Sequence, residues 1–270
     1  MPTLYLSDLD GTLLRSDQRT SAFTNDTINR LVQERMLFSY ATARSYQTAH
    51  QVTEGLNAHI PLIVYNGAFI IDNATGETLL ANMFTAEEAN GILMDLLAAD
   101  LAPIVYCRDD RERFVYNRTR ISPETQDFVS SRQGDPRSTP VGHNCDLYRP
   151  NTFYFTCIDL PEKLLPLYEQ FREVYTCVFS KDIYSGAQWL EIMPKAATKA
   201  QAGRQLAKLL HCDKIVAFGD AVNDLSLFDA ADECYAVANA AEALKERATA
   251  VIGKNDEDGV ARWLAENWQK

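Results

Sequence analysis

The chain has 270 residues, 46% of them hydrophobic, and a formal charge of −11. This length fits one large domain or two modest ones, with enough apolar residues for a sizeable core. So acidic a chain repels a phosphate backbone, and no apolar run approaches the roughly 20 residues of a membrane span. We therefore expect neither a nucleic acid nor a membrane as a partner.

The beginning of the chain and its cysteines indicate a cytoplasmic protein. Asp8 and Asp10 stand where a signal peptide would need an apolar segment. The six cysteines are scattered, with no C-x-x-C pair and no histidine at metal-ligand spacing, which favours reduced thiols and argues against zinc.

The first third of the chain alternates strands with helices, as expected of a parallel sheet. The run Pro61–Tyr65 is continuously apolar, which is typical of a strand buried on both faces. The predicted strands are Thr3–Ser7, Leu37–Ala41 and Pro61–Tyr65, the helices lie near Asn25–Arg35 and after Arg44, and a hairpin joins Ala68–Ile71 to Glu77–Ala81.

After Met83 the alternation gives way to a mixture of hairpins and helices. A capping box at Thr85–Glu88 opens the first of these helices. We interpret residues 83–185 as an inserted α+β domain. Its predicted helices are Thr85–Ala99, Ser122–Ser131 and Glu162–Arg172, its strands Ile104–Cys107, Phe114–Tyr116, Thr152–Ile158 and Val174–Ser180, and its long loop Gln133–Pro150.

Alternation resumes in the last third. The predicted fold class is therefore α/β, with a Rossmann-like, doubly wound parallel-sheet core formed by residues 1–82 and 186–270. The predicted strands here are Trp189–Met193, Lys214–Phe218, Cys234–Val237 and Thr249–Ile252, and the helices are Lys199–Leu210, Asp224–Ala230, Glu242–Arg247 and Gly259–Asn267.

The stretch Asp8-Leu9-Asp10-Gly11-Thr12 directly follows the first predicted strand. Alternate side chains of a strand share a face, so the two carboxylates would crowd together unless they bind a cation or share a proton. The carboxyl ends of the strands are also where α/β sheets bind ligands. The alternative is an ordinary Asp-Gly turn with a solvated Asp8.

The predicted strand that begins at Lys214 ends in Gly219-Asp220, and Asn223-Asp224 opens the helix after it. If the two strands are neighbours, Asp220 lies beside Asp8 and three carboxylates come within reach of one cation. Oxygen ligands without histidine or cysteine favour Mg²⁺. Asn223 could instead be the N-cap of the helix.

Three further elements could bind an anion. Lys199 begins a predicted helix, where a cation opposes the helix dipole unless an anion is near; Lys195 competes for this role, or is a solvated loop lysine. The segment Thr42–Arg44 follows a strand and could hold a phosphate oxygen, or Thr42 could cap a helix. Asn66-Gly67 could equally form a tight turn.

In these elements the chain resembles the haloacid dehalogenase superfamily, and specifically its Cof-like phosphatases of class IIB, which carry a large α/β cap. The resemblance spans nearly the whole chain, with Ala43 where the family's T-G-R usually has glycine. The family's D-x-D-G-T matches Asp8–Thr12, T-G-R matches Thr42–Arg44, Y-N-G matches Asn66-Gly67, the lysine after E-I-x-P matches Lys199, G-D-x-x-N-D matches Asp220–Asp224, and E-D-G-V matches Asp256–Val260.

The resemblance implies Mg²⁺-dependent hydrolysis of a small phosphate monoester, a sugar or cofactor phosphate, through an aspartyl-phosphate. Asp8 would be the nucleophile and Asp10 the acid and then the base, with Thr42 and Lys199 completing the catalytic set. The expected partner is a small phosphorylated metabolite, and the expected state is a monomer or weak homo-oligomer. The implied metal ligands are Asp8, Asp10, Asp220 and Asp224, and the implied phosphate-binding residues are Leu9, Thr42, Ala43, Arg44, Asn66, Gly67, Lys199 and Asn223.

Other functions share parts of this pattern. A phosphomutase of the same superfamily would use the same core and pass the phosphate to a sugar hydroxyl. A phospho-accepting signalling protein would also have an acidic Mg²⁺ site, but at about half this length and without the insertion. A dehalogenase would need no acid at Asp10. We expect the inserted domain to select the substrate, with one or two arginines of a predicted hairpin reaching the site. The candidates are Arg108, Arg111, Arg113, Arg118 and Arg120. The alternative is a solvated hairpin whose arginines are neutralised by Asp109, Asp110 and Glu112.

Overall fold

In the computed structural model, the chain is described for residues 2–56, 60–181 and 186–268. It divides into two compact units. The core unit comprises residues 1–81 and 196–270, and the inserted unit comprises residues 82–195. Among the described residues, no helix is both long enough and apolar enough to cross a bilayer.

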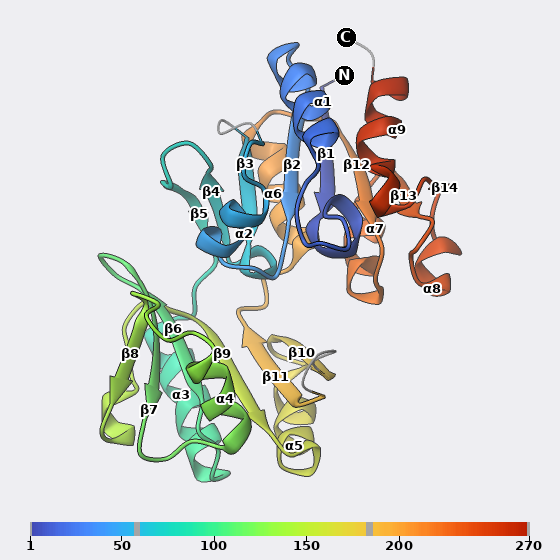
Figure 1. The fold of residues 1–270 in the computed structure, drawn as a ribbon. Coiled ribbons are helices and arrows are strands. Elements are labelled where there is room, and N and C mark those ends of the chain that lie inside the picture. Colours follow the sequence, from blue (N-terminus) through green and yellow to red (C-terminus); the bar gives the residue numbers. More distant parts are fainter. Residues whose placement is uncertain (1, 57–59, 182–185, 269–270) are drawn as a thin grey trace. The chain divides into compact units, whose positions relative to one another are not determined.

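The core unit is built on an eight-stranded sheet in which the strands from β14 to β3 run parallel and β4 and β5 are antiparallel (Figure 1). The hairpin β4–β5 was predicted and is confirmed. In spatial order the strands are β14 (Ala250–Ile252), β13 (Glu233–Val237), β12 (Lys214–Gly219), β1 (Thr3–Asp8), β2 (Leu37–Ala41), β3 (Pro61–Val64), β4 (Phe69–Asp72) and β5 (Thr78–Ala81).

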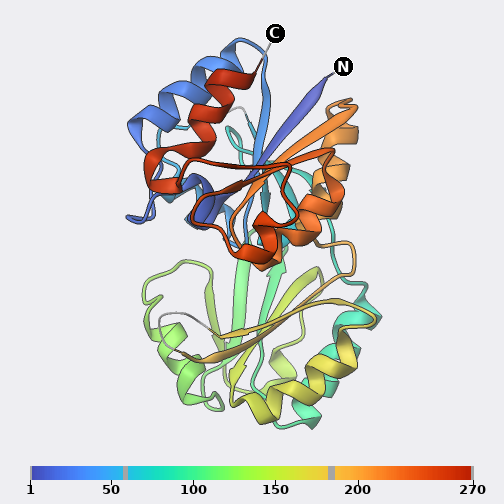
Figure 2. The ribbon, with the colours of Figure 1, turned by 90° about the vertical axis from the view of Figure 1, so that its right-hand side faces the viewer.

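Helices cover both faces of this sheet, so the predicted doubly wound core is confirmed (Figure 2). On one face α1 (Ala22–Gln33) contacts α9 (Gly259–Asn267), and on the other α6 (Lys199–Leu209) contacts α7 (Leu225–Ala230). The shorter helices are α2 (Tyr46–Val52) and α8 (Glu242–Lys245).

Strand β1 lies between β2 and β12, in parallel register with both. Its side chains Leu4 and Leu6 are fully buried. Phe218 of β12 is also fully buried, and Phe38 of β2 is nearly so. Because parallel strands end at the same edge of a sheet, this arrangement brings the residues that follow β1, β2 and β12 together.

The inserted unit has a six-stranded sheet that is antiparallel except for the pair β7–β8. Helices α3 (Ala86–Ala98) and α5 (Pro161–Phe171) cover one face, and α4 (Pro123–Ser130) lies on the other (Figure 2). The strand order is β10 (Thr176–Lys181), β11 (Gln188–Met193), β9 (Thr152–Asp159), β6 (Ile104–Arg108), β7 (Glu112–Asn117) and β8 (Ser138–Val141).

Two expectations differ from the structure here. The expected insertion, 83–185, ends before β11, but β11 pairs with β9 and β10, so the inserted unit runs on to residue 195. The expected loop Gln133–Pro150 contains β8 and the 3₁₀ turn η3 (Asn144–Asp146). Strand β8 is an edge strand, where a proline such as Pro140 is tolerated.

Candidate active site

Strand β1 leads directly into a single π-helical turn, η1 (Leu9–Leu13). Leu14 N donates to Leu9 O at 2.9 Å and closes the turn. Gly11 has a φ of +78°, and a Cβ there would lie 2.4 Å from Asp220 Oδ2, so both the backbone and the neighbouring loop require glycine. Isolated π-turns of this kind often occur at functional sites.

A buried ionic cluster lies where β1, β12 and α6 meet. Lys199 Nζ donates to Asp8 Oδ1 and, at 2.8 Å, to Asp224 Oδ1. The relative exposures of Lys199, Asp8 and Asp224 are 5%, 5% and 0%. Lys199 is the first residue of α6, as predicted, and its ammonium group is held there by the two carboxylates.

Asp220 completes the cluster from the end of β12. Its Oδ1 accepts a hydrogen bond from the Thr12 hydroxyl at 2.9 Å. Carboxylate oxygens of Asp8, Asp220 and Asp224 all lie within 4.8 Å of one another. Asp224 Oδ2 also accepts from the backbone N–H groups of Asp220 and Ala221, both at 3.2 Å. Asp224 therefore holds both this loop and the Lys199 ammonium group.

The electrostatics of the cluster follow from three carboxylates around one ammonium. Burial raises the pKa of Asp8 well above its ordinary value, with Asp224 and Asp220 adding to the rise and Lys199 opposing it. Burial also raises the pKa of Asp220, against the hydrogen bond from Thr12. Burial alone would lower the pKa of Lys199, but Asp8 and Asp224 together raise it. The cluster therefore favours additional positive charge.

Asp10 lies outside this cluster. It is exposed, and its carboxylate accepts two-pronged hydrogen bonds from Arg44: Nη2 to Oδ1 at 2.6 Å and Nε to Oδ2 at 2.8 Å. Such a fork holds both the position and the plane of a carboxylate. Because η1 turns the chain after β1, Asp8 and Asp10 do not share a face as two residues of one strand would.

Thr42 and the turn Tyr65–Gly67 (η2) line up beside the end of β2. Thr42 is buried, its Oγ1 accepts from Arg44 N at 3.1 Å, and its carbonyl accepts from Asn66 N at 2.9 Å. Asn66 and Gly67 have positive φ, and a Cβ on Gly67 would lie 2.4 Å from Thr198 O. This glycine thus lets the turn touch the residue before Lys199.

The alternatives left open by the sequence can now be resolved. The N-cap of α2 is Ser45, not Thr42, and α7 begins at Leu225 with Asp224 before it, so Asn223 is not its cap. Asn66-Gly67 does form a tight turn. Lys195 is exposed, and its Nζ donates to Glu173 O in the inserted unit.

The remaining predicted binding residues contribute differently. The Leu9 side chain is fully buried, so only its backbone can face a ligand. Ala43 is exposed between Thr42 and Arg44, and Asn223 is exposed in the turn η4 (Val222–Asp224) that ends in the buried Asp224. In the inserted unit, Arg113 forms ion pairs with Asp109 and Asp110, and Arg120 with Asp100.

Some residues that shape the site carried no assignment from the sequence. Asn239, which follows β13, donates from Nδ2 to Gly11 O at 2.8 Å. Asn255 donates from Nδ2 to Leu14 O at 2.9 Å. Both stand at the carboxyl end of a core strand, and that position is the signal that could have found them.

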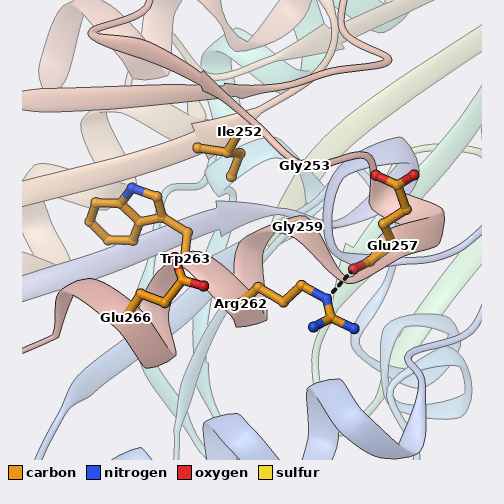
Figure 3. Close-up of a pocket in the computed structure, with 7 residues that line it drawn as sticks. All are labelled: Ile252, Gly253, Glu257, Gly259, Arg262, Trp263 and Glu266. Atoms are coloured by element: carbon orange, nitrogen blue, oxygen red, sulfur yellow. Dashed lines mark hydrogen bonds between the residues drawn. The ribbon is translucent and has the colours of Figure 1, made fainter.

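A surface pocket of about 560 Å³ lies between β14 and α9 (Figure 3). In it Arg262 Nε donates to Glu257 O at 2.8 Å, and Trp263 and Glu266 stand along the helix. None of its lining residues belongs to the predicted site. Gly253 and Gly259 both line the pocket, and their backbones approach so closely that a Cβ on Gly259 would lie 2.0 Å from Gly253 O.

Comparison with known proteins adds the family. The model of the haloacid dehalogenase-like hydrolases matches residues 5–264. The chain is 27% identical to the 5-amino-6-(5-phospho-D-ribitylamino)uracil phosphatase YwtE of Bacillus subtilis, over 95% of each chain. It is 26% identical to the HMP-PP phosphatase of Serratia proteamaculans, over 99% of this chain and 96% of that one.

Solved structures show the same fold. The crystal structure of TM0651 from Thermotoga maritima is similar with a TM-score of 0.80 at 25% identity, over 100% of this chain and 98% of that one. A haloacid dehalogenase-like hydrolase from Bacteroides thetaiotaomicron has a TM-score of 0.79 at 20% identity, over 99% and 100%. With the family model covering nearly the whole sequence, the chain belongs to the haloacid dehalogenase-like hydrolases and is a Cof-like phosphatase.

Proposed function

We propose that this phosphatase hydrolyses phosphate monoesters of small metabolites, sugar or cofactor phosphates, with Mg²⁺ and through an aspartyl-phosphate on Asp8. The observation that carries the proposal is the buried cluster in which Lys199 bridges Asp8 and Asp224 beside Asp220. A nucleophile, a fixed cation and a set of hard oxygen ligands are what this reaction requires in one place.

The donor set fits Mg²⁺. Asp8, Asp220 and Asp224 offer only oxygens, and their three negative charges exceed the single charge of Lys199. When bound, Mg²⁺ supplies Lewis-acid polarisation of the phosphoryl group and screens its charge from the nucleophile. We assign Asp8 and Asp220 as side-chain ligands, Asp10 through its main-chain carbonyl, and Asp224 as the residue that supports them.

In the first step Asp8 attacks phosphorus and the bond from phosphorus to the ester oxygen breaks. Asp10 gives its proton to that leaving oxygen. In the second step Asp10 takes a proton from water as the water oxygen attacks phosphorus, and the bond from phosphorus to Asp8 breaks. The products are the alcohol and inorganic phosphate, and both aspartates return to their starting states.

The other residues hold the phosphoryl group and the acid. The Lys199 ammonium and the Thr42 hydroxyl stabilise the phosphoryl oxygens, and the Arg44 fork fixes the Asp10 carboxylate in one orientation. The wider phosphate-binding set comprises the backbone of Leu9 and Ala43, the turn Asn66-Gly67 and Asn223.

The substrate class rests on the relatives. Two Bacillus subtilis relatives, YwtE and YitU, are phosphatases of 5-amino-6-(5-phospho-D-ribitylamino)uracil, and the Serratia relative is an HMP-PP phosphatase. The first two names specify a small molecule that carries one phosphate, which supports a small phosphate monoester as the substrate here.

A metabolite screen tests this function. Purified protein with Mg²⁺ is assayed for phosphate release across a panel of sugar and cofactor monophosphates, with Asp8→Asn as the matched inactive control. We expect release from at least one monoester, complete loss with chelator, and inhibition by Ca²⁺, whose longer bonds and higher coordination number distort the site. Transfer of phosphate to a second sugar hydroxyl in place of water would instead indicate a mutase, and turnover after exhaustive chelation would contradict the metal assignment.

A further inference from the structure

Two asparagines hold the carbonyl groups of the turn that carries the proposed chemistry. Leu14 N donates to Leu9 O and closes the turn η1, while two carbonyls of this segment accept from side chains outside it. Asn239 Nδ2 donates to Gly11 O at 2.8 Å, and Asn255 Nδ2 donates to Leu14 O at 2.9 Å. The middle and the end of the turn are thus each held by a side-chain amide.

The two asparagines are also joined to each other. Asn255 N donates to Asn239 Oδ1 at 3.0 Å, so both ends of the Asn239 amide are engaged although the residue is exposed. Two residues later, Ala241 N donates to Asp220 O at 2.8 Å. One short segment after β13 therefore holds both the turn beyond Asp8 and the loop that carries Asp220.

Gly11 is the point at which this support matters. Its peptide groups stand between Asp10 and Thr12, and Thr12 in turn donates to Asp220. With a φ of +78° and no side chain, Gly11 has more conformational freedom than its neighbours. A rotation of its peptide would move the Asp10 carboxylate and the Thr12 hydroxyl together.

The other end of the support is buried and tightly packed. Asn255 is only 8% exposed and begins the turn η5 (Asn255–Glu257), which is pinned by the close crossing of Gly253 and Gly259. After it, Asp258 accepts hydrogen bonds from Arg15 and Ser21, which lie beyond η1 in the sequence.

We propose that Asn239, backed by Asn255, is a positioning residue that fixes the Gly11 peptide and so aligns Asp10 with the bond that breaks. The inference rests on the proposed function, because it assigns Asn239 to the step in which Asp10 acts. Asn239 acts through the backbone of η1 and reaches Asp10 only by that route.

The kinetic test compares Asn239→Ala with Asn267→Ala. Asn267 is the matched control because its Nδ2 also donates to a backbone carbonyl, Trp263 O at 2.8 Å, on α9. We expect Asn239→Ala to lower kcat for an alkyl phosphate about tenfold, with KM within about twofold and the melting temperature unchanged, and to affect p-nitrophenyl phosphate less, since its leaving group needs less proton donation. Asn239→Asp, which keeps the shape but loses the donor, should show the same loss.

A second measurement does not depend on turnover. Amide hydrogen exchange of the peptide that covers residues 9–14 should be about fivefold faster in Asn239→Ala than in the wild type and in Asn267→Ala. Unchanged exchange in that peptide, or a kcat equal to that of the control, overturns the positioning role. If the wild type releases no phosphate from any monoester, the proposed function fails, and the exchange result still decides whether Asn239 holds the turn.

Discussion

Removing the charge of Lys199 would leave two buried carboxylates facing each other without their common partner. Asp8 and Asp224 are 5% and 0% exposed, and Lys199 donates to both. Deleting one member of a buried ion pair generally costs 3–5 kcal/mol. We expect the lower end of that range, because Asp8 already has a raised pKa and can take up a proton. Lys199→Met should therefore lower the free energy of unfolding by about 3 kcal/mol at pH 7.

The loss should depend on pH with a definite sign. Burial raises the pKa of Asp8, and Lys199 opposes the rise, so the pKa should climb further without the lysine. A carboxyl group with a raised folded-state pKa is tolerated while it keeps its proton and destabilises the fold as the pH rises through that pKa. The difference between Lys199→Met and the wild type should accordingly be small in mildly acidic buffer and grow toward neutral and alkaline pH.

Urea denaturation in metal-free buffer, followed by circular dichroism at several pH values, measures this. Lys195→Met is the matched control, because Lys195 is an exposed lysine four positions earlier whose Nζ contacts a backbone carbonyl, and we expect little change from it. A loss below about 1 kcal/mol at pH 7, the size typical of an exposed ion pair, would contradict the account of the cluster. A loss that does not vary with pH would contradict the role given to Asp8.

Three further outcomes are expected. Arg44→Met should lower kcat about tenfold for alkyl phosphates and less for p-nitrophenyl phosphate, because Arg44 orients Asp10 as the acid; equal losses on both substrates would argue against this. Gly67→Ala should destabilise the fold by at least about 2 kcal/mol in thermal or urea melts, because its φ is +103° and a Cβ would lie 2.4 Å from Thr198 O. Gly134→Ala is the control: its φ is +87° but a Cβ would meet no atom within 4 Å, so it should cost less. Burial would raise the pKa of Asp258, but the hydrogen bonds that it accepts lower the pKa below its ordinary value. Asp258→Asn should therefore be less stable than the wild type at pH 7, and this difference should disappear as the pH falls through the lowered pKa. A difference in stability that persists in acid would contradict the prediction.

The parts of the site that follow from strand ends were predictable from sequence. Polar residues after Leu6, Ala41 and Phe218 stand at the same edge of the sheet, because consecutive elements of an α/β core place the carboxyl ends of parallel strands together. Once β1 is next to β12, the neighbourhood of Asp8 and Asp220 is fixed by register alone.

Other features depend on contacts that no local pattern records. The π-turn after Asp8 is closed by a backbone bond, and its conformation depends on Asp220, which is distant in the sequence. Buried and partly buried residues alternate along most of strand β11. A strand of either sheet can show this pattern, so residues 188–193 alone do not reveal that β11 pairs with β9 and β10. The hydrogen bonds from Arg44 to Asp10 likewise depend on how the segment after β2 approaches the turn η1.

The most direct test of the central claim is to trap the phosphoryl group on Asp8. A substrate with labelled phosphate, found in the metabolite screen, is mixed with enzyme and Mg²⁺, quenched in acid within the first turnover, and the labelled peptide is identified. We predict an acid-stable, base-labile label on the peptide that contains Asp8, no label in Asp8→Asn, and a longer-lived label in Asp10→Asn, because Asp10 is needed to activate the water. Phosphate release by Asp8→Asn at more than a trace of the wild-type rate would contradict the covalent mechanism.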